Sequence, residues 1–182
     1  MSSDDSARML IGKLAVSGRK IVFAESCTAG LIAATLGRIP GASSVLAGSA
    51  VVYQLETKHA WLGVDREALI DTGAVSKTVS EQMARGVLSH TPHSRIAASI
   101  TGHLGPEAPP ELDGVAWSSV AVNTDNGVAV VSRRLDLSPS AAEATASSMD
   151  AISVRHARQR SAVEQVLLFC ITVADGGDGP FD

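Results

Sequence analysis

Four consecutive residues, Glu25 to Thr28, place a carboxylate, two hydroxyls and a thiol side by side in the stretch FAESCTAGLIAAT. A serine hydroxyl becomes a nucleophile when a nearby base, usually histidine or lysine, takes its proton. Ser26 is therefore a candidate nucleophile. The alternative is a structural role, because serine and threonine at the start of a helix commonly accept hydrogen bonds from its free amides. Thr28 is placed to cap the helix that follows.

The candidate base is Lys58. Segment 43–53 has the apolar pattern of a strand and segment 54–63 that of a helix, so Lys58 falls in the first turns of a helix after a strand end. Burial or a neighbouring cation would have to lower the pKa of the amine from about 10.4 towards neutrality for it to act as a base. Tyr53, at the strand end, could orient the lysine or relay a proton. The alternative is that Lys58 is a solvated helix residue and Tyr53 an interfacial anchor.

Other residues near predicted strand ends offer ligand contacts. The backbone amides that start the helix after Ser26 could donate to an oxyanion or hold a phosphate, and the residues alone leave this choice open. Cys27 and Gly30 lie on the same turn. Thr101 and Gly102 end another apolar segment and provide a hydroxyl and room for the close approach of a ligand.

The elements that must position these residues alternate along the chain. Predicted strands lie at 20–26, 43–53, 94–102, 115–122 and 127–137, and predicted helices at 7–18, 28–39, 54–63, 65–73, 74–90 and 138–174. Asn126-Gly127 predicts a hairpin between the last two strands. This order predicts the α/β class, as a three-layer α/β/α sandwich with a mixed sheet. We assign residues 1–174 to one domain and 175–182 to a disordered tail.

The composition argues against several classes of function. The 182 residues carry a net charge of −4 with no long run of either sign, which disfavours a nucleic-acid surface. No apolar stretch approaches the length of a membrane span and the N-terminus lacks a signal-peptide pattern, so we expect a cytoplasmic protein without a membrane partner. Compact α/β enzymes commonly form homo-oligomers, and we expect a symmetric one here.

Metal and cofactor motifs are not found in the sequence. His90 and His93 flank a turn at Pro92, and no third ligand follows at the spacing of a zinc site. A Walker loop, a G-x-S-x-G elbow and a dinucleotide fingerprint are also missing. We therefore expect neither a metal nor a cofactor.

With these residues in hand, the chain resembles the C-terminal domain family of CinA, the competence/damage-inducible protein. The stretches AESCTAGLIAATL, PGASSVLAGSAVVY, KHAWLGV, LIDTGAVS and ITGHLGP are similar to successive motifs of that family, in order and with similar spacing. The resemblance implies a three-layer α/β/α fold and a serine/lysine amidohydrolase. Its small-molecule substrate would be nicotinamide mononucleotide (NMN), converted to nicotinate mononucleotide and ammonia, or a related pyridine or amide.

By position, the resemblance implies Ser26 as the nucleophile, Lys58 as the base and Tyr53 as a supporting catalytic residue. The implied substrate-binding residues are Cys27, Thr28, Gly30, Thr101, Gly102 and one arginine near the C-terminus. Arg155, Arg158 and Arg160 compete for the arginine position, and we choose Arg158.

The departures from the family pattern support a second hypothesis. Ala29 replaces the first glycine of the usual T-G-G, and the loop HLGPEAPPELDG carries His103, Leu104 and Glu107 where small residues are expected. Glu107 would repel a substrate phosphate, which predicts weak activity on NMN and a gain on Glu107→Gly. The alternative to an amidohydrolase is thus a catalytically altered ligand-binding or regulatory module. A purely structural subunit is a third hypothesis.

Overall fold

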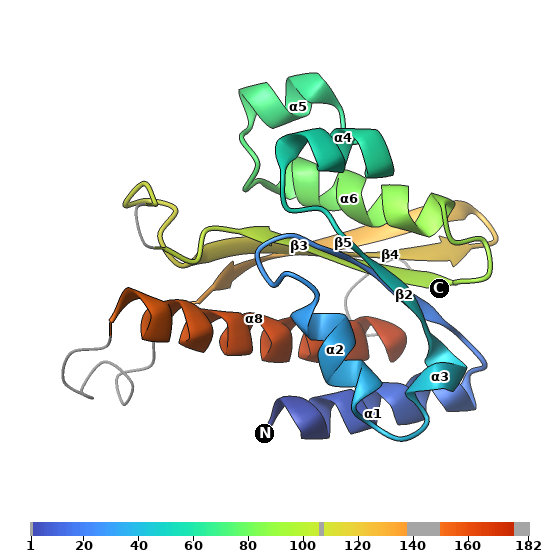
Figure 1. Cartoon of the computed structure of the whole chain (residues 1–182). Coiled ribbons are helices and arrows are strands. Elements are labelled where there is room, and N and C mark those ends of the chain that lie inside the picture. The colour runs from blue at the N-terminus through green and yellow to red at the C-terminus, as the bar shows by residue number, and fades with distance from the viewer. Residues whose placement is uncertain (1, 106–107, 138–149, 177–182) are drawn as a thin grey trace.

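The computed structural model describes residues 2–105, 108–137 and 150–176, which form a five-stranded sheet between two layers of helices (Figure 1). The strands are β1 (Ile21–Glu25), β2 (Leu46–Val51), β3 (Ile96–Gly102), β4 (Val115–Thr124) and β5 (Gly127–Asp136). They lie in the order β2-β1-β3-β4-β5, with β1 parallel to both β2 and β3, β4 antiparallel to β3, and β5 antiparallel to β4. The predicted mixed sheet and the β4–β5 hairpin are confirmed.

Helices connect and cover the strands. Those described are α1 (Ser3–Val16), α2 (Leu31–Gly37), α3 (Ala42–Val45), α4 (Leu55–Leu62), α5 (Arg66–Asp71), α6 (Lys77–Ser89) and α8 (Ala151–Ala174). The start of the strand predicted at 43–53 is wrong, because α3 forms there first. A short apolar run fits either element, and tertiary packing decides between them. Of the helix predicted at 138–174, residues 138–149 lie outside the described part.

The two faces of the sheet bury separate apolar clusters. Ile21 and Phe23 of β1 pack in a cluster with residues of α1, α2 and α8, whereas Val22 and Ala24 pack with residues of α4, α5 and α6. Alternation along a strand sends successive side chains to opposite faces, so one apolar strand supplies both clusters. This arrangement confirms the three-layer α/β/α prediction.

A buried hydroxyl network fixes α6 against the sheet. The Ser80 hydroxyl of α6 lies 3.0 Å from the Ser99 hydroxyl of β3 and accepts a hydrogen bond from Ser119 of β4 at 2.8 Å. All three side chains are buried. Because a buried hydroxyl without a partner is costly, these bonds favour one register between α6 and the strands.

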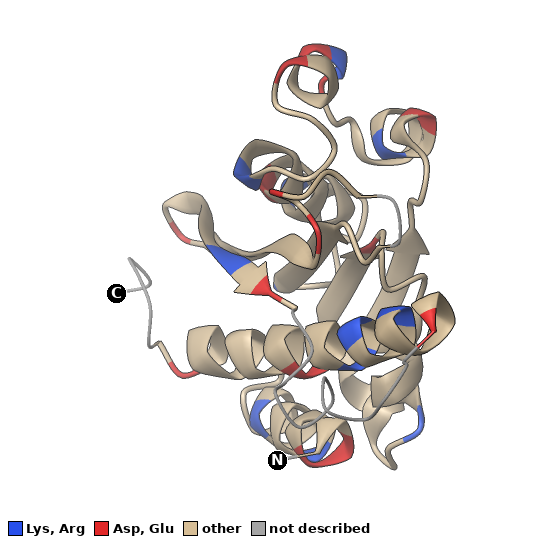
Figure 2. Ribbon diagram, turned by 90° about the vertical axis from the view of Figure 1, so that its left-hand side faces the viewer, with Lys and Arg blue, Asp and Glu red and all other residues tan. Residues whose placement is uncertain are grey.

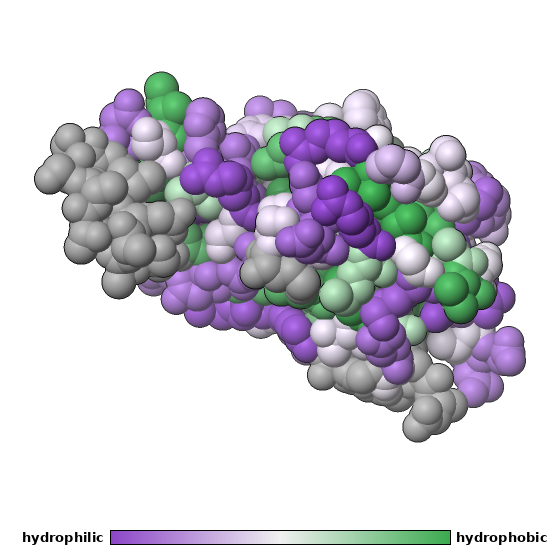
Figure 3. Space-filling model, turned by 90° about the horizontal axis from the view of Figure 1, so that it is seen from below, coloured by the Kyte–Doolittle hydropathy of each residue, from purple (hydrophilic) through white to green (hydrophobic). Residues whose placement is uncertain are grey.

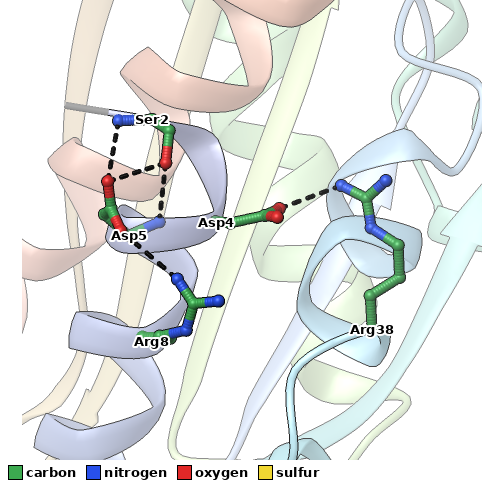
Figure 4. Close-up of polar contacts among 5 residues, drawn as sticks. All are labelled: Ser2, Asp4, Asp5, Arg8 and Arg38. Atoms are coloured by element: carbon green, nitrogen blue, oxygen red, sulfur yellow. Dashed lines mark hydrogen bonds and ion pairs between the residues drawn. The ribbon is translucent and has the colours of Figure 1, made fainter.

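Charged residues are distributed over the outside of the molecule. Figure 2 shows positive and negative segments interspersed on the helices and loops, and the face below the sheet in Figure 3 mixes hydrophilic and hydrophobic residues. At the N-terminus of α1, Ser2 and Asp5 cap the helix, and Asp4 reaches Arg38, just beyond α2, with an N–O distance of 3.1 Å (Figure 4). An ion pair exposed to solvent in this way contributes little to the free energy of unfolding.

Gly86 lets α4 lie directly against α6. A Cβ atom at Gly86 would collide with the backbone carbonyl of Leu62 in α4, whereas nothing lies within 4 Å of a Cβ added at Gly12 of α1. We predict that Gly86→Ala lowers the unfolding free energy by about 1–3 kcal/mol through overpacking, despite the better helix propensity of alanine. Gly12→Ala is the matched control and should stabilise by up to about 1 kcal/mol. Denaturant unfolding measures both, and a stabilised Gly86→Ala would contradict the packing.

Candidate active site

Ser26 and Lys58 form a direct contact at the carboxyl end of β1. Lys58 Nζ donates to Ser26 Oγ at 2.7 Å and to the carbonyl oxygen of Val52 at 2.8 Å. The lysine is 1% exposed and the serine 7%. Ser26 begins the turn after β1, and Lys58 lies on α4, the helix that follows the end of β2. The alternative in which Lys58 is a solvated helix residue is therefore wrong.

Burial sets the protonation of Lys58. Removal from water disfavours the charged amine and lowers the pKa of Lys58 to about 8. Among the described residues, no carboxylate lies within ion-pair distance of the amine. A substantial fraction of Lys58 is consequently neutral near pH 8, the form in which an amine accepts a proton.

The neighbouring thiol is unsuited to nucleophilic chemistry. Cys27 is 4% exposed, and burial raises the pKa of its thiol to about 12. Its backbone carbonyl accepts a hydrogen bond from the Gln159 side chain of α8 at 3.2 Å. Because a thiol reacts as the thiolate, Ser26 is the better nucleophile of the two.

Thr28 does not cap the following helix. The first residue of α2 is Leu31 and its N-cap is Gly30, which has no side chain to cap the helix. The Thr28 hydroxyl instead donates to Glu25 at 2.8 Å. The capping prediction is wrong because the buried Glu25 carboxylate takes the place of a cap and accepts from the amides of Ile32 and Ala33, each at 3.0 Å.

This capping by Glu25 also changes which amides a ligand can reach. The Ile32 and Ala33 amides, expected to be free donors, are occupied. The amides of Cys27 and Thr28 donate to no backbone carbonyl within the described residues. The turn immediately after Ser26, rather than α2 itself, is therefore the available source of donors.

Glu25 itself was missed by the sequence reasoning as a site residue. The signal was present, because a carboxylate inside an apolar strand segment is almost never fully buried unless it is paired or hydrogen-bonded.

The remaining predicted residues surround this corner in different ways. Tyr53 is 51% exposed, and its hydroxyl accepts from Arg155 Nη2 at 2.6 Å. Thr101 is buried and donates to the carbonyl oxygen of Ala74 at 2.8 Å. A Cβ atom at Gly102 would collide with Ala116 of β4, so the packing of the sheet itself requires this glycine.

The three competing arginines differ in their partners. Arg158 is 7% exposed and forms a bidentate pair with Asp113, both N–O distances being 2.7 Å. Arg155 donates to the Gly105 carbonyl at 2.8 Å and to Tyr53, both neutral acceptors. Arg160 lines a separate cleft of about 420 Å³ beside α1 and α2. Glu107 of the altered loop lies outside the described residues.

Arg155 and Gln159 are the residues that reach across to the corner. They are four positions apart on α8 and thus on one face of the helix, a spacing visible in the sequence. What the sequence does not show is which face of α8 meets the turn after Ser26.

The structure describes an α/β/α domain in which a buried serine and a buried lysine are in contact at the carboxyl edge of the parallel strands. In open α/β sheets this edge is where ligands bind. No cluster of three or more metal-ligating side chains occurs among the described residues, and none of the described helices is both long and apolar enough to cross a membrane.

The chain belongs to the CinA C-terminal domain family, whose model matches residues 3–159. A CinA-like protein of Mycobacterium leprae (strain TN) is 46% identical over 106 residues, which are 57% of this chain and 24% of the relative. The chain thus spans about a quarter of the length of such curated relatives.

Solved structures share the fold. The crystal structure of competence/damage inducible protein CihA from Agrobacterium tumefaciens has a TM-score of 0.78 at 29% identity, covering 94% of both chains. A CinA superfamily protein from Klebsiella pneumoniae 700603 has a TM-score of 0.81 at 21% identity, covering 97% of this chain and 99% of that one. The second likeness concerns the fold alone.

Ala29, the residue that departs from the family's glycine pattern, has a left-handed backbone with φ of +52°. We predict that Ala29→Gly stabilises the protein by up to about 1 kcal/mol, because glycine removes the strain but adds entropy to the unfolded chain. Ala15→Gly, on the exposed side of α1, is the control and should destabilise by about 0.5–1 kcal/mol. Thermal unfolding of the two variants checks the opposite signs, and a loss of stability in Ala29→Gly would contradict the strain.

Proposed function

We propose that this protein is an amidohydrolase that converts NMN and water to nicotinate mononucleotide and ammonia, with Ser26 as nucleophile and Lys58 as base. The observation that carries the proposal is the 2.7 Å contact between the buried Lys58 amine and the Ser26 hydroxyl. The lowered pKa of Lys58 supports it, because a base must be neutral at the working pH. The choice of NMN rests on the resemblance to the family.

In the first half of the reaction, neutral Lys58 takes the proton of the Ser26 hydroxyl, and Oγ attacks the carboxamide carbon. The amides of Cys27 and Thr28 are candidates to stabilise the oxyanion that forms. The protonated lysine then gives its proton to the amide nitrogen, the C–N bond breaks, and ammonia leaves. The products of this half are an acyl ester on Ser26 and neutral Lys58.

In the second half, Lys58 takes a proton from water, and the resulting hydroxide attacks the ester carbon. The ester C–O bond breaks, and the lysine returns its proton to Ser26 Oγ. The nicotinate carboxyl group is released and ionises in water. The net reaction is the hydrolysis of an amide, and neither half includes a redox step.

The arginine pairing bears on how the mononucleotide is held. A phosphate would compete with the Asp113 carboxylate for both Nη atoms of Arg158, and its binding would break that charged pair. Among the described residues, the acceptors that Arg155 would exchange for a phosphate are neutral. We therefore propose Arg155 in place of Arg158 as the phosphate ligand.

A second candidate function is a catalytically altered member of the family that binds a ligand without hydrolysing it. The observation that favours it is Ala29, which stands on the turn after Ser26 where the family pattern has glycine, and whose backbone is left-handed. That protein would be a ligand-binding module, distinguished by binding of NMN without ammonia release.

We predict that Ser26→Ala and Lys58→Arg each lower kcat/KM for NMN by about 10³-fold or more. Alanine removes the nucleophile, and a guanidinium cannot give up its proton to become a base. Lys77→Arg makes the same change at an exposed lysine of α6 and should keep the wild-type rate. Ammonia release and nicotinate mononucleotide are measured together with calorimetric binding of NMN.

Equal rates for the wild type and Ser26→Ala would remove Ser26 as the nucleophile. Binding without turnover in the wild type would favour the ligand-binding module.

The activity should rise with pH across the pKa of Lys58. Its value of about 8 predicts that kcat/KM increases from pH 6 to 9 with an apparent midpoint near 8, since the neutral amine is the reactive form. The pH dependence of kcat/KM, with controls for buffer effects, measures this midpoint. A rate that is flat between these values, or that falls, would exclude Lys58 as the proton acceptor.

A further inference from the structure

We propose that Glu25 is a positioning residue of this site, whose buried carboxylate holds the turn that presents Ser26 to Lys58. The inference rests on the proposed role of Ser26 as nucleophile. Glu25 is the last residue of β1 and fully buried, and its side chain points away from Lys58, towards α2. It therefore acts through the backbone rather than on the reacting atoms.

The carboxylate ties three elements to one point. Oε2 accepts from the Thr28 hydroxyl at 2.8 Å and the Ile32 amide at 3.0 Å. Oε1 accepts from the Ala33 amide and the Ser49 hydroxyl of β2, each at 3.0 Å. The donors before and after Ala29 thus meet the same group, and the turn between Ser26 and α2 is held at both ends.

The backbone of Glu25 links the same turn to the base. Its carbonyl accepts from the Val52 amide at 2.8 Å, the Val52 carbonyl accepts from Lys58 Nζ at 2.8 Å, and Nζ donates to Ser26 Oγ at 2.7 Å. The result is a closed ring of hydrogen bonds and covalent bonds through Glu25, Val52, Lys58 and Ser26. A shift of β1 against β2 would therefore move the nucleophile and the base apart.

An amide cannot replace the carboxylate here. Each carboxylate oxygen accepts from one backbone amide of α2, and these amides cannot turn away. Glutamine offers one oxygen and one NH₂ group, so in either orientation its NH₂ faces the N–H of Ile32 or Ala33. The geometry thus requires an acceptor on both sides, which glutamate meets and glutamine does not.

The decisive experiment compares Glu25→Gln with Glu67→Gln, the same change at an exposed carboxylate of α5. Labelling of Ser26 by a fluorophosphonate probe measures nucleophile presentation without NMN, and steady-state kinetics with NMN give kcat and KM. For Glu25→Gln we expect labelling and kcat to fall on the order of 10- to 100-fold, because misplacement of reacting groups by about 1 Å costs that much. KM should stay within about threefold and the pH midpoint should not move, because the base is unchanged.

Wild-type labelling and kcat in a folded Glu25→Gln would overturn the proposal. So would a loss accompanied by a shifted pH midpoint, because Glu25 would then act through its charge on Lys58.

A measurement on the unaltered protein decides the matter if Glu25→Gln does not fold. Ile32 and Ala33 are the second and third residues of α2, and Glu67 and Ala68 hold the same positions in α5, whose N-cap side chain accepts no hydrogen bond from the first turn. We expect the amides of α2 to exchange with solvent at least about tenfold more slowly than those of α5. Equal exchange rates in the two helices would overturn the proposed role of Glu25.

The two proposals fail in different ways. If the probe labels Ser26 but NMN is not hydrolysed, NMN is excluded as the substrate and the proposed role of Glu25 remains. A wild-type Ser26 that the probe does not label removes the nucleophile, and the positioning role with it.

Discussion

The burial of one lysine amine is the constraint on which this site depends. Lys58 is 1% exposed, and its Nζ has two hydrogen-bond acceptors, Ser26 Oγ and the Val52 carbonyl. A protonated amine held by neutral acceptors away from water is costly, and the pKa of Lys58 falls for that reason. The same burial that is unfavourable for folding supplies the neutral amine that proton transfer needs.

Two buried residues of opposite charge, Glu25 and Lys58, lie on the sides of two different helix layers. Glu25 points towards α2, with the same face as Ile21 and Phe23, while Lys58 approaches from the layer of α4. Hydroxyl and amide donors satisfy the carboxylate, so it needs no cation. If the acid instead faced the amine, an ion pair would raise the pKa of Lys58 and keep it charged. A buried carboxylate and a buried amine can therefore lie near the same strand end without forming an ion pair.

The loop between β3 and β4 packs against an arginine of α8. A Cβ atom added at Gly105 would come within 2.6 Å of Arg158 Nη1, and one added at Gly114 within 3.2 Å of its Nε, while both Nη atoms bind Asp113. This pair joins the loop before β4 to α8. Arg155 joins the same helix to Gly105 and to Tyr53, at the other side of the corner. The two arginines, three residues apart, therefore have different partners among the described residues: a carboxylate for Arg158, and a carbonyl and a phenol hydroxyl for Arg155.

The sequence by itself determined the α/β class, the hairpin and the order of the elements, because apolar periodicity and turn residues are local properties. It also indicated Ser26 and Lys58 as a nucleophile and a base, since residue type and position near strand ends are visible along the chain. It placed the helix cap wrongly at Thr28, whereas its choice of Arg158 as the substrate-binding arginine stays a prediction.

Only the tertiary structure decided the burial of Lys58 and the capping of α2. Whether Lys58 is solvated or buried depends on how α4 packs, and Glu25 caps α2 only because β1 and α2 meet at one corner. Which arginine faces the site depends on the rotation of α8 against the sheet. Burial and hydrogen-bond partners come from residues distant in sequence, so no local pattern contains them.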